Sequence, residues 1–373
     1  MEVTVIGGGN VGSAMAARMS LINGVKVTLW TRRPERFKSR IRVIDRENGT
    51  EFGSKEIMVT ADSGDAVRNA DIVFCTVPSF ARADCVSRMS AHLKKDVLLG
   101  FVPGSGGAEF ICKKLLPPDT TIFALQRVPY TCRMLKEGEC CAINSIKPVI
   151  YAASIPSAAT ASVRKLVEDL LRIPCVALDS FLEATLVPSN AILHTSRNYR
   201  LFKNYTQGTF YKNNPYFYLD WDDESSEILL SCDGELQNVC RLLGGLKGVV
   251  PLREHYESST PEQLTNKLST MPAFKRSSTL SPMVEQSPGK WVPDWESRYF
   301  IEDFPYGLAV IKGFANIVRA GVPTIDKVLG WYQKISGQEY FRANGQPGTH
   351  IKHCGAPQRY GYTAIGGVMC LYG

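Results

Sequence analysis

Short apolar runs rich in β-branched residues alternate with helix-like runs along the first half of the chain. Such alternation predicts βαβ units and a parallel sheet whose faces are covered by helices. The clearest helical stretch is 10–22, and a second helical pattern, 157–172, separates the last two apolar runs. The apolar runs are 2–7, 26–31, 70–78, 96–104, 121–126, 148–154 and 174–180.

The pattern changes after about residue 185, where strand signals fade and amphipathic helical spacing dominates. A stretch rich in Ser and Pro, 275–294, is expected to be a long loop. The helical patterns are 234–246, 260–270, 306–321 and 324–337. We therefore expect an α/β domain over 1–185 followed by a mostly helical domain over 186–373.

The composition favours a globular protein that binds small molecules. The chain has 373 residues, of which 44% are hydrophobic and 21% charged, and a length of this order suggests two cores. Its densest basic run, 31–42, has one aromatic residue and no known nucleic-acid-binding motif, so the net charge of +7 does not indicate a nucleic-acid partner. The most apolar run, 306–322, is interrupted by Lys312 and Arg319, which argues against a membrane span.

Cysteine usage and the N-terminal residues favour a cytoplasmic location. The eleven cysteines form no CxxC pair, as is typical of reduced thiols, and the opening residues lack the pattern of a signal peptide. The segment 350–354, "HIKHC", has no second ligand cluster to complete it, so we expect no metal site. No helix pattern requires a partner chain, which leaves a monomer or a homodimer open.

The segment 5–15, "VIGGGNVGSAM", contains the spacing Gly-x-Gly-x-x-Gly between a predicted strand and a predicted helix. In that context the spacing is typical of a Rossmann-like dinucleotide-binding domain, because it combines a tight turn, close approach of the pyrophosphate and close helix packing. The alternative is a glycine-rich turn without a ligand. The expected cofactor contacts are Gly7, Gly9, Asn10, Val11 and Gly12.

The end of the second predicted strand indicates which dinucleotide is used. NAD-dependent enzymes usually carry an acidic residue there for the ribose hydroxyls. This chain has Thr31, Arg32 and Arg33 instead, and its first carboxylate is Glu35. Arginines suit a 2′-phosphate, so NADP(H) is favoured over NAD(H), although a solvated basic loop would give the same residues.

Two further loops follow later strands, "TVPSFA" at 76–81 and "VPGSGG" at 102–107. Both should lie at the carboxyl edge of the sheet, where Val77 and Pro78 are expected beside the nicotinamide. On their chemistry alone, either loop could be an ordinary turn.

Asn190 and His194 stand one helical turn apart on an apolar segment of a chain with five histidines. A buried histidine capped by a neighbouring amide is one interpretation. The other is a general acid/base, because the pKa of His lies closest to neutrality.

A second polar pair, Arg298 and Asp303, flanks an apolar turn in 297–308, "SRYFIEDFPYGL". Arg can bind a substrate carboxylate through two hydrogen bonds. An Asp bonded to one imidazole nitrogen would fix the tautomer of a histidine and stabilise imidazolium. Each residue could equally be a surface ion-pair member or a helix cap.

These motifs, in this order, resemble the opine dehydrogenases, the octopine/nopaline dehydrogenase family. The glycine motif, "PYTCR" (129–133), "NAILH" (190–194) and "RYFIEDFPYGL" (298–308) carry the resemblance, which continues through 320–341 and covers nearly the whole chain. The Asn-x-x-x-His and Arg-x-x-x-x-Asp elements are its most specific marks.

The resemblance implies a dinucleotide-binding domain joined to a helical catalytic domain. It implies reductive condensation of the amino group of an amino acid with a 2-keto acid such as pyruvate, through an imine. By the same resemblance His194 is the acid/base, Asp303 its partner and Arg298 the ligand of the keto-acid carboxylate. Asn190 would orient the substrate or the nicotinamide, and the substrates would lie between the domains.

The chain departs from the family at two places. Ala191 stands where the family often has Pro. Octopine-type enzymes also place a carboxylate before the "PYTCR" loop to receive the guanidinium of arginine, whereas this chain has Gln126 followed by Arg127. We therefore expect a neutral or acidic amino acid rather than arginine.

Two other functions fit the same motifs. A hydroxyacid dehydrogenase of related architecture would reduce a keto acid without an amine. A non-catalytic dinucleotide sensor would keep the glycine motif but would have no use for His194, Arg298 and Asp303 together.

Overall fold

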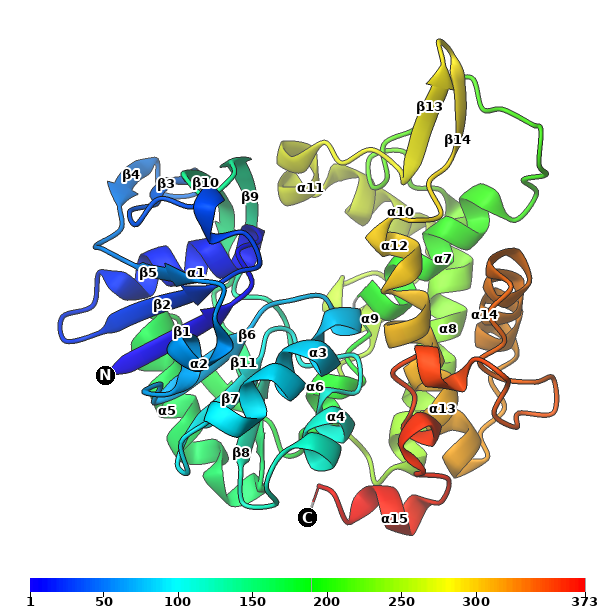
Figure 1. The fold of residues 1–373 in the computed structure, drawn as a ribbon. Helices are drawn as coiled ribbons and strands as arrows, with labels where there is room; N and C mark the ends of the chain where they lie inside the picture. Colours follow the sequence, from blue (N-terminus) through cyan, green and yellow to red (C-terminus); the bar gives the residue numbers. More distant parts are fainter. Residues whose placement is uncertain (189, 373) are drawn as a thin grey trace. The chain divides into compact units, whose positions relative to one another are not determined.

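The computed structural model describes residues 1–188 and 190–372. The chain forms two compact units, Met1–Thr185 together with Met369–Gly373, and Leu186–Val368 (Figure 1). From the sequence we expected all residues after 185 to form one helical domain. In the structure, the segment Met369–Gly373 belongs to the first unit instead. The reason is a buried contact, in which the Tyr372 hydroxyl donates to Oε1 of Glu109 over 2.8 Å.

An eight-stranded sheet forms the centre of the first unit, in the order β12-β11-β8-β7-β6-β1-β2-β5. From β5 to β8 the strands run parallel, with β1 between β2 and β6. The strands are β1 (Glu2–Ile6), β2 (Lys26–Trp30), β5 (Met58–Thr60), β6 (Ile72–Cys75), β7 (Leu98–Phe101), β8 (Thr121–Leu125), β11 (Ile150–Ile155) and β12 (Cys175–Ala177).

The expected parallel sheet is wrong at one end, because β11 pairs antiparallel to β8. A parallel neighbour would need a crossover helix between the two strands. The chain instead forms the hairpin of β9 (Tyr130–Lys136) and β10 (Cys140–Ile146) there.

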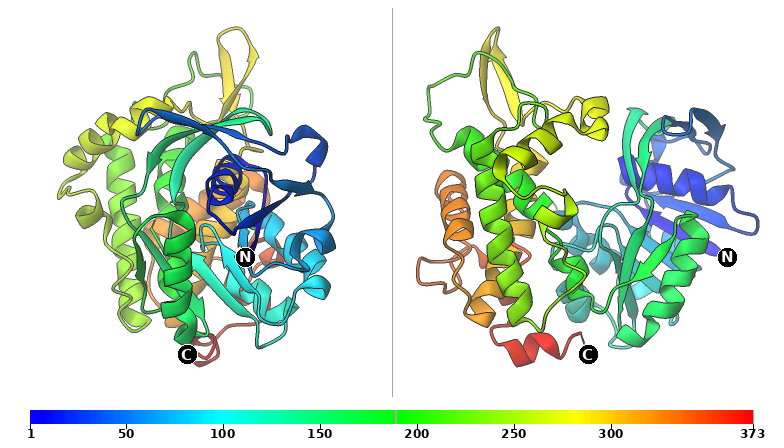
Figure 2. Two further views of the ribbon diagram at one scale, coloured as in Figure 1. Left: turned by 90° about the vertical axis from the view of Figure 1, so that its left-hand side faces the viewer. Right: turned by 180° about the vertical axis from the view of Figure 1, so that it is seen from behind.

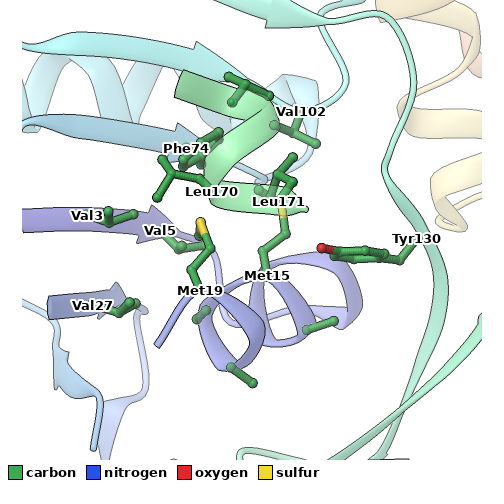
Figure 3. Close-up of a cluster of buried hydrophobic side chains, with 14 of the residues drawn as sticks. Val3, Val5, Met15, Met19, Val27, Phe74, Val102, Tyr130, Leu170 and Leu171 are labelled. Atoms are coloured by element: carbon green, nitrogen blue, oxygen red, sulfur yellow. The ribbon is translucent and has the colours of Figure 1, made fainter. Parts of the chain in front are cut away.

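Helices cover the sheet on both faces (Figures 1 and 2). On one face α1 (Asn10–Ser20) packs beside α5 (Thr160–Leu171), and the other face carries α2 (Ser63–Val67), α3 (Ser79–Met89) and α4 (Ala108–Leu115). Figure 3 shows Met15 and Met19 extending from α1 toward Val5 of β1 and toward Leu170 and Leu171 of α5. Burial of these apolar side chains fixes the start of α1 at the edge of β1.

A second sheet, with the order β4-β3-β10-β9, was not predicted from the sequence. It adds β3 (Arg42–Asp45) and β4 (Thr50–Gly53) to the β9–β10 hairpin, and α1 packs against it. Its inward side chains, such as Val43 and Ile143, are fully buried, whereas its outer positions carry charges. Strands this short with alternating charges give a weak pattern.

The second unit is mainly helical, as expected, and is built around α8 (Asp223–Leu242). Every other long helix in this unit packs on α8: α7 (Asn190–Phe202), α10 (Pro261–Thr270), α13 (Ala309–Val318) and α14 (Pro323–Ser336). Short elements join them: α9 (Leu252–His255), α12 (Arg298–Ile301), a π-helical turn η4 (Phe304–Leu308) and α15 (Ile365–Met369).

The long loop expected at 275–294 is instead partly ordered. It contains the end of α11 (Pro272–Ser277) and the hairpin of β13 (Met283–Ser287) and β14 (Lys290–Pro293), which is labelled in Figure 1. Its turn uses Gly289 at φ +71°, a conformation that favours glycine. Residues such as Val284 remain exposed, so hydrophobic periodicity does not mark the hairpin.

No helix within residues 1–188 and 190–372 is long and apolar enough to span a membrane.

Candidate active site

The glycine motif forms a turn between β1 and α1 that can hold a pyrophosphate. Gly7 has φ +108°, which favours glycine, and a Cβ on Gly12 would lie 1.9 Å from the Gly7 carbonyl oxygen. A Cβ on Gly9, in contrast, would meet no atom within 4 Å. Gly9 directly precedes α1, whose first backbone N–H groups lack helical partners and attract anions.

The loop after β6 is tied directly to this turn. The Thr76 hydroxyl donates to the Ile6 carbonyl over 2.8 Å, and the Val77 side chain would lie 3.0 Å from a Cβ on Gly7. Pro78 then caps the start of α3. Because β1 and β6 are adjacent parallel strands from which the chain crosses over in opposite directions, their carboxyl ends form the crevice where nucleotides bind in such sheets.

The two remaining motif residues face the protein. Asn10 accepts a hydrogen bond from the Met134 N–H of β9 at 2.7 Å, and Val11 packs against the hydrophobic core. Oδ1 of Asn10 therefore joins the glycine turn to the second sheet.

The arginines after β2 differ in their surroundings. Arg33 and Arg36 share the carboxylate of Glu137, at 3.2 and 2.8 Å, and the Arg36 hydrogen bond and nearby positive charges lower the pKa of Glu137. Arg32 is exposed and forms no ion pair with any described residue, and Thr31 is partly buried. Of the two predicted arginines, Arg32 is therefore the one whose guanidinium is not held by a carboxylate of the described residues.

His194 and Asp303 form a hydrogen-bonded pair in the second unit. His194 lies on α7 with an exposed fraction of 8%, and its Nδ1 is 2.8 Å from Oδ2 of Asp303, at the start of η4. Close packing of the two elements produces this contact: a Cβ on Gly307 would lie 2.9 Å from Cα of Ala191. Ala191 thus stands at a close approach of η4 to α7.

Burial and the facing imidazole act in opposite directions on the pKa of the Asp303 carboxyl. Burial raises the pKa of the Asp303 carboxyl, while the facing imidazole of His194 acts in the opposite direction. An Asp303 carboxylate that accepts from Nδ1–H leaves Nε2 as the nitrogen available to accept a proton. The same carboxylate stabilises imidazolium when Nε2 is protonated.

Sequence reasoning missed the residue that meets Nε2. The Tyr218 hydroxyl lies 2.8 Å from Nε2, and the rings of Tyr299 and Phe217 lie 4.6 and 5.4 Å from the imidazole, between centroids. The segment 213–221, "NNPYFYLDW", has no periodicity that would place it beside α7. Its density of aromatic residues was the only available signal.

The other two predicted site residues lie on or beside the elements that carry the pair, and the charge of Arg298 acts on the Asp303 carboxyl. Arg298 begins α12, its Nε donates to Glu302 over 2.8 Å, and its side chain is 66% exposed. Asn190 is exposed at the start of α7, one turn before His194.

Gln126 lies at the end of β8 in the first unit. It is buried, and its Nε2 donates to the Glu183 carbonyl over 2.9 Å. Nearby, burial lowers the pKa of Lys147, and the positive charge of Arg127 lowers it further. This edge therefore carries two cations beside a neutral amide.

The histidines of "HIKHC" are engaged within the loop. His350 Nδ1 accepts from the Glu339 N–H, and His353 Nδ1 bonds Gln338. No group of three or more metal-binding side chains gathers within the described residues.

The fold and the site together define a dinucleotide-dependent oxidoreductase. Residues 2–102 match the NAD-dependent glycerol-3-phosphate dehydrogenase N-terminus, and residues 177–336 match the alpha-helical domain of NAD/NADP octopine/nopaline dehydrogenase. The chain belongs to the opine dehydrogenase family, whose members are NAD(P)-dependent oxidoreductases acting on CH–NH bonds. The resemblance and fold class inferred from the sequence are thus confirmed.

Similar proteins match over almost their whole length. Tauropine dehydrogenase of Arabella iricolor is 25% identical, covering 98% of this chain and 99% of its own. Octopine dehydrogenase of Pecten maximus is 24% identical, covering 99% and 98%. A solved structure of octopine dehydrogenase with NADH and L-arginine superposes with a TM-score of 0.86 at 25% identity, covering 99% of this chain and 97% of that one.

Proposed function

We propose that this protein condenses the amino group of an amino acid with a 2-keto acid, pyruvate in the first instance, and reduces the resulting imine with NADPH. The His194–Asp303 pair carries this proposal, because imine formation needs a group that both accepts and donates protons near neutrality. A solved complex of octopine dehydrogenase with NADH and pyruvate supports the choice of keto acid.

In this reaction His194 manages the protons of condensation. The substrate ammonium gives a proton to Nε2, the free amine attacks the keto carbon, and the imidazolium returns the proton to the departing hydroxyl, which leaves as water. Asp303 holds the ring and stabilises imidazolium throughout. The reduced nicotinamide supplies the hydride that reduces the imine carbon.

Arg298 is the proposed ligand of the keto-acid carboxylate. A guanidinium binds a carboxylate through two parallel hydrogen bonds, and Arg298 already holds Glu302 through Nε and Nη2. The proposal requires the substrate carboxylate to replace or share this partner. Asn190, one turn before His194, is the proposed orienting residue.

A neutral or acidic side chain is proposed for the amino acid. The residue at the end of β8 is the neutral amide Gln126 rather than a carboxylate, and the cations Arg127 and Lys147 are close to it. A cationic substrate side chain would be repelled there. Octopine dehydrogenase, in contrast, has been solved with L-arginine and with agmatine.

The proposed preference for NADPH rests on Arg32. The glycine turn fits a dinucleotide, and no acidic side chain follows β2 until Glu35. Arg32 is the exposed cation that could bind a 2′-phosphate. The octopine dehydrogenase complexes contain NADH, so the two cofactors must be compared directly.

The test is oxidation of NADPH and NADH at neutral pH with pyruvate, with and without neutral, acidic and basic amino acids. Oxidation that needs both substrates, together with a secondary-amine product in the mass spectrum, is the expected result. Oxidation with the keto acid alone would identify a hydroxyacid dehydrogenase instead. Arginine as the fastest amino donor would contradict the Gln126 argument.

A further inference from the structure

We propose that Tyr218 relays the proton between Nε2 of His194 and the substrate oxygen. This inference rests on the proposed function and adds a residue to its chemistry. It starts from one observation: Asp303 occupies Nδ1, and the Tyr218 hydroxyl occupies the other nitrogen at 2.8 Å.

A tyrosine hydroxyl can donate one hydrogen bond and accept another, as a proton relay requires. Its oxygen can accept a hydrogen bond from Nε2–H of imidazolium while its own proton is donated elsewhere. When the carbinolamine hydroxyl departs, Tyr218 passes its proton to the leaving oxygen and receives one from Nε2. The C–O bond breaks, water leaves, and Tyr218 ends neutral, as it began.

Burial favours the relay over direct transfer. His194 is buried, with an exposed side-chain fraction of 10%, and the rings of Phe217 and Tyr299 lie against its imidazole. Tyr218 is partly exposed. A substrate oxygen that approaches Nε2 therefore meets the Tyr218 hydroxyl on this nitrogen.

Tyr218 is held by a structure that limits its movement. Arg197, on the same helix as His194, is buried and donates to the carbonyls of Phe217 and Asp220, on either side of Tyr218. The Tyr218 ring also stacks on Phe274 of α11, with centroids 3.8 Å apart and planes inclined by 5°. Such constraints keep the hydroxyl at Nε2 rather than letting it leave.

The test compares Tyr218→Phe with Tyr211→Phe. Tyr211 lies in the same unit and donates to the Leu201 carbonyl over 3.1 Å, so the control also removes one tyrosine hydrogen bond. For Tyr218→Phe we expect kcat to fall by about tenfold to a hundredfold, with the KM for pyruvate changed less than about threefold. The control should keep both constants within about twofold.

A double mutant separates a relay from a structural effect. If Tyr218 acts through His194, adding Tyr218→Phe to His194→Gln lowers the residual kcat no further. Losses that multiply overturn the relay, as does a Tyr218→Phe enzyme that is as fast as wild type or faster. If the wild-type enzyme turns over and Tyr218→Phe is equally fast, the relay is overturned and the proposed function stands. If the wild-type enzyme turns over no pair of amino acid and keto acid, the proposed function is overturned as well.

Discussion

Nδ1 of His194 lies 2.8 Å from Oδ2 of Asp303, although 109 residues separate them in the chain. The contact depends on the close approach of η4 to α7 at Gly307 and Ala191. Each residue has an ordinary structural interpretation when taken alone. Their pairing fixes the ring of the proposed acid/base and gives the first two predictions.

Replacing His194 by Ala removes the proposed acid/base. We expect kcat to fall by about 10²–10⁴-fold, because this is the usual contribution of a positioned general acid/base. The dissociation constant of NADPH, measured by fluorescence titration, should stay within about twofold, since the glycine turn belongs to the other unit. Near-full turnover would remove His194 from the mechanism.

Asp303→Asn tests the orienting role. An amide in place of the carboxylate can present N–H to Nδ1 and select the wrong tautomer, so kcat should fall by about 10²–10⁴-fold. Asp326→Asn is the control, because it weakens an ion pair between α14 and Lys312 of α13 in the same unit. Equal losses in the two variants would contradict an orienting role for Asp303.

Two glycine substitutions separate folding from cofactor binding. A Cβ on Gly12 would lie 1.9 Å from the Gly7 carbonyl oxygen, so Gly12→Ala should lower the melting temperature and weaken NADPH binding. A Cβ on Gly9 meets nothing within 4 Å, so Gly9→Ala should keep the melting temperature. It should still weaken NADPH binding, because the methyl group enters the space assigned to the pyrophosphate. Wild-type affinity in Gly9→Ala would place the pyrophosphate elsewhere.

Arg32→Ala tests the choice of cofactor. A charge-assisted hydrogen bond contributes roughly 1.5–3 kcal/mol, so the KM for NADPH should rise by about tenfold to a hundredfold while that for NADH changes little. Arg33→Ala is the matched control, because Arg33 is already paired with Glu137. Parallel changes for both cofactors in Arg32→Ala would show that Arg32 does not read the 2′-phosphate.

Glu109 gives a prediction about stability and pH. Its side chain is fully buried, Oε1 accepts from Thr185 and Tyr372, and Oε2 has no hydrogen-bond partner among the described residues. Burial raises the pKa of this carboxyl, so the folded chain holds a proton that the unfolded chain releases above its ordinary pKa of about 4.3. The stability due to this group is therefore complete below that pH and declines as the pH rises toward the folded pKa.

Glu109→Gln keeps the Oε1 acceptor and removes the titration. The melting temperature of the variant relative to wild type should therefore increase as the pH rises from about 4 to about 8. Over this range, which begins near the ordinary pKa of about 4.3, the wild-type protein loses the contribution of this carboxyl to its stability. A constant difference across this range would show that Glu109 does not titrate on unfolding.

Local contacts explain what the sequence by itself determined. The strand–glycine turn–helix at the N-terminus, the spacing of Asn190 and His194 on α7, and the helical second half depend on residues a few positions apart, and the side-chain pattern records such contacts directly. The absence of an acidic residue directly after β2 is likewise visible in the local sequence. Family resemblance then supplied the roles of residues that local patterns could not relate to one another.

Tertiary packing decided the rest. The antiparallel β11, the second sheet and the return of Tyr372 to Glu109 follow from where apolar faces are buried, which a one-dimensional pattern does not specify. The pairing of Arg33 with Glu137, which leaves Arg32 available, joins distant segments in the same way. Tyr218 reaches Nε2 because Arg197 and Phe274 fix an aperiodic segment beside α7, and periodicity cannot encode contacts of that kind.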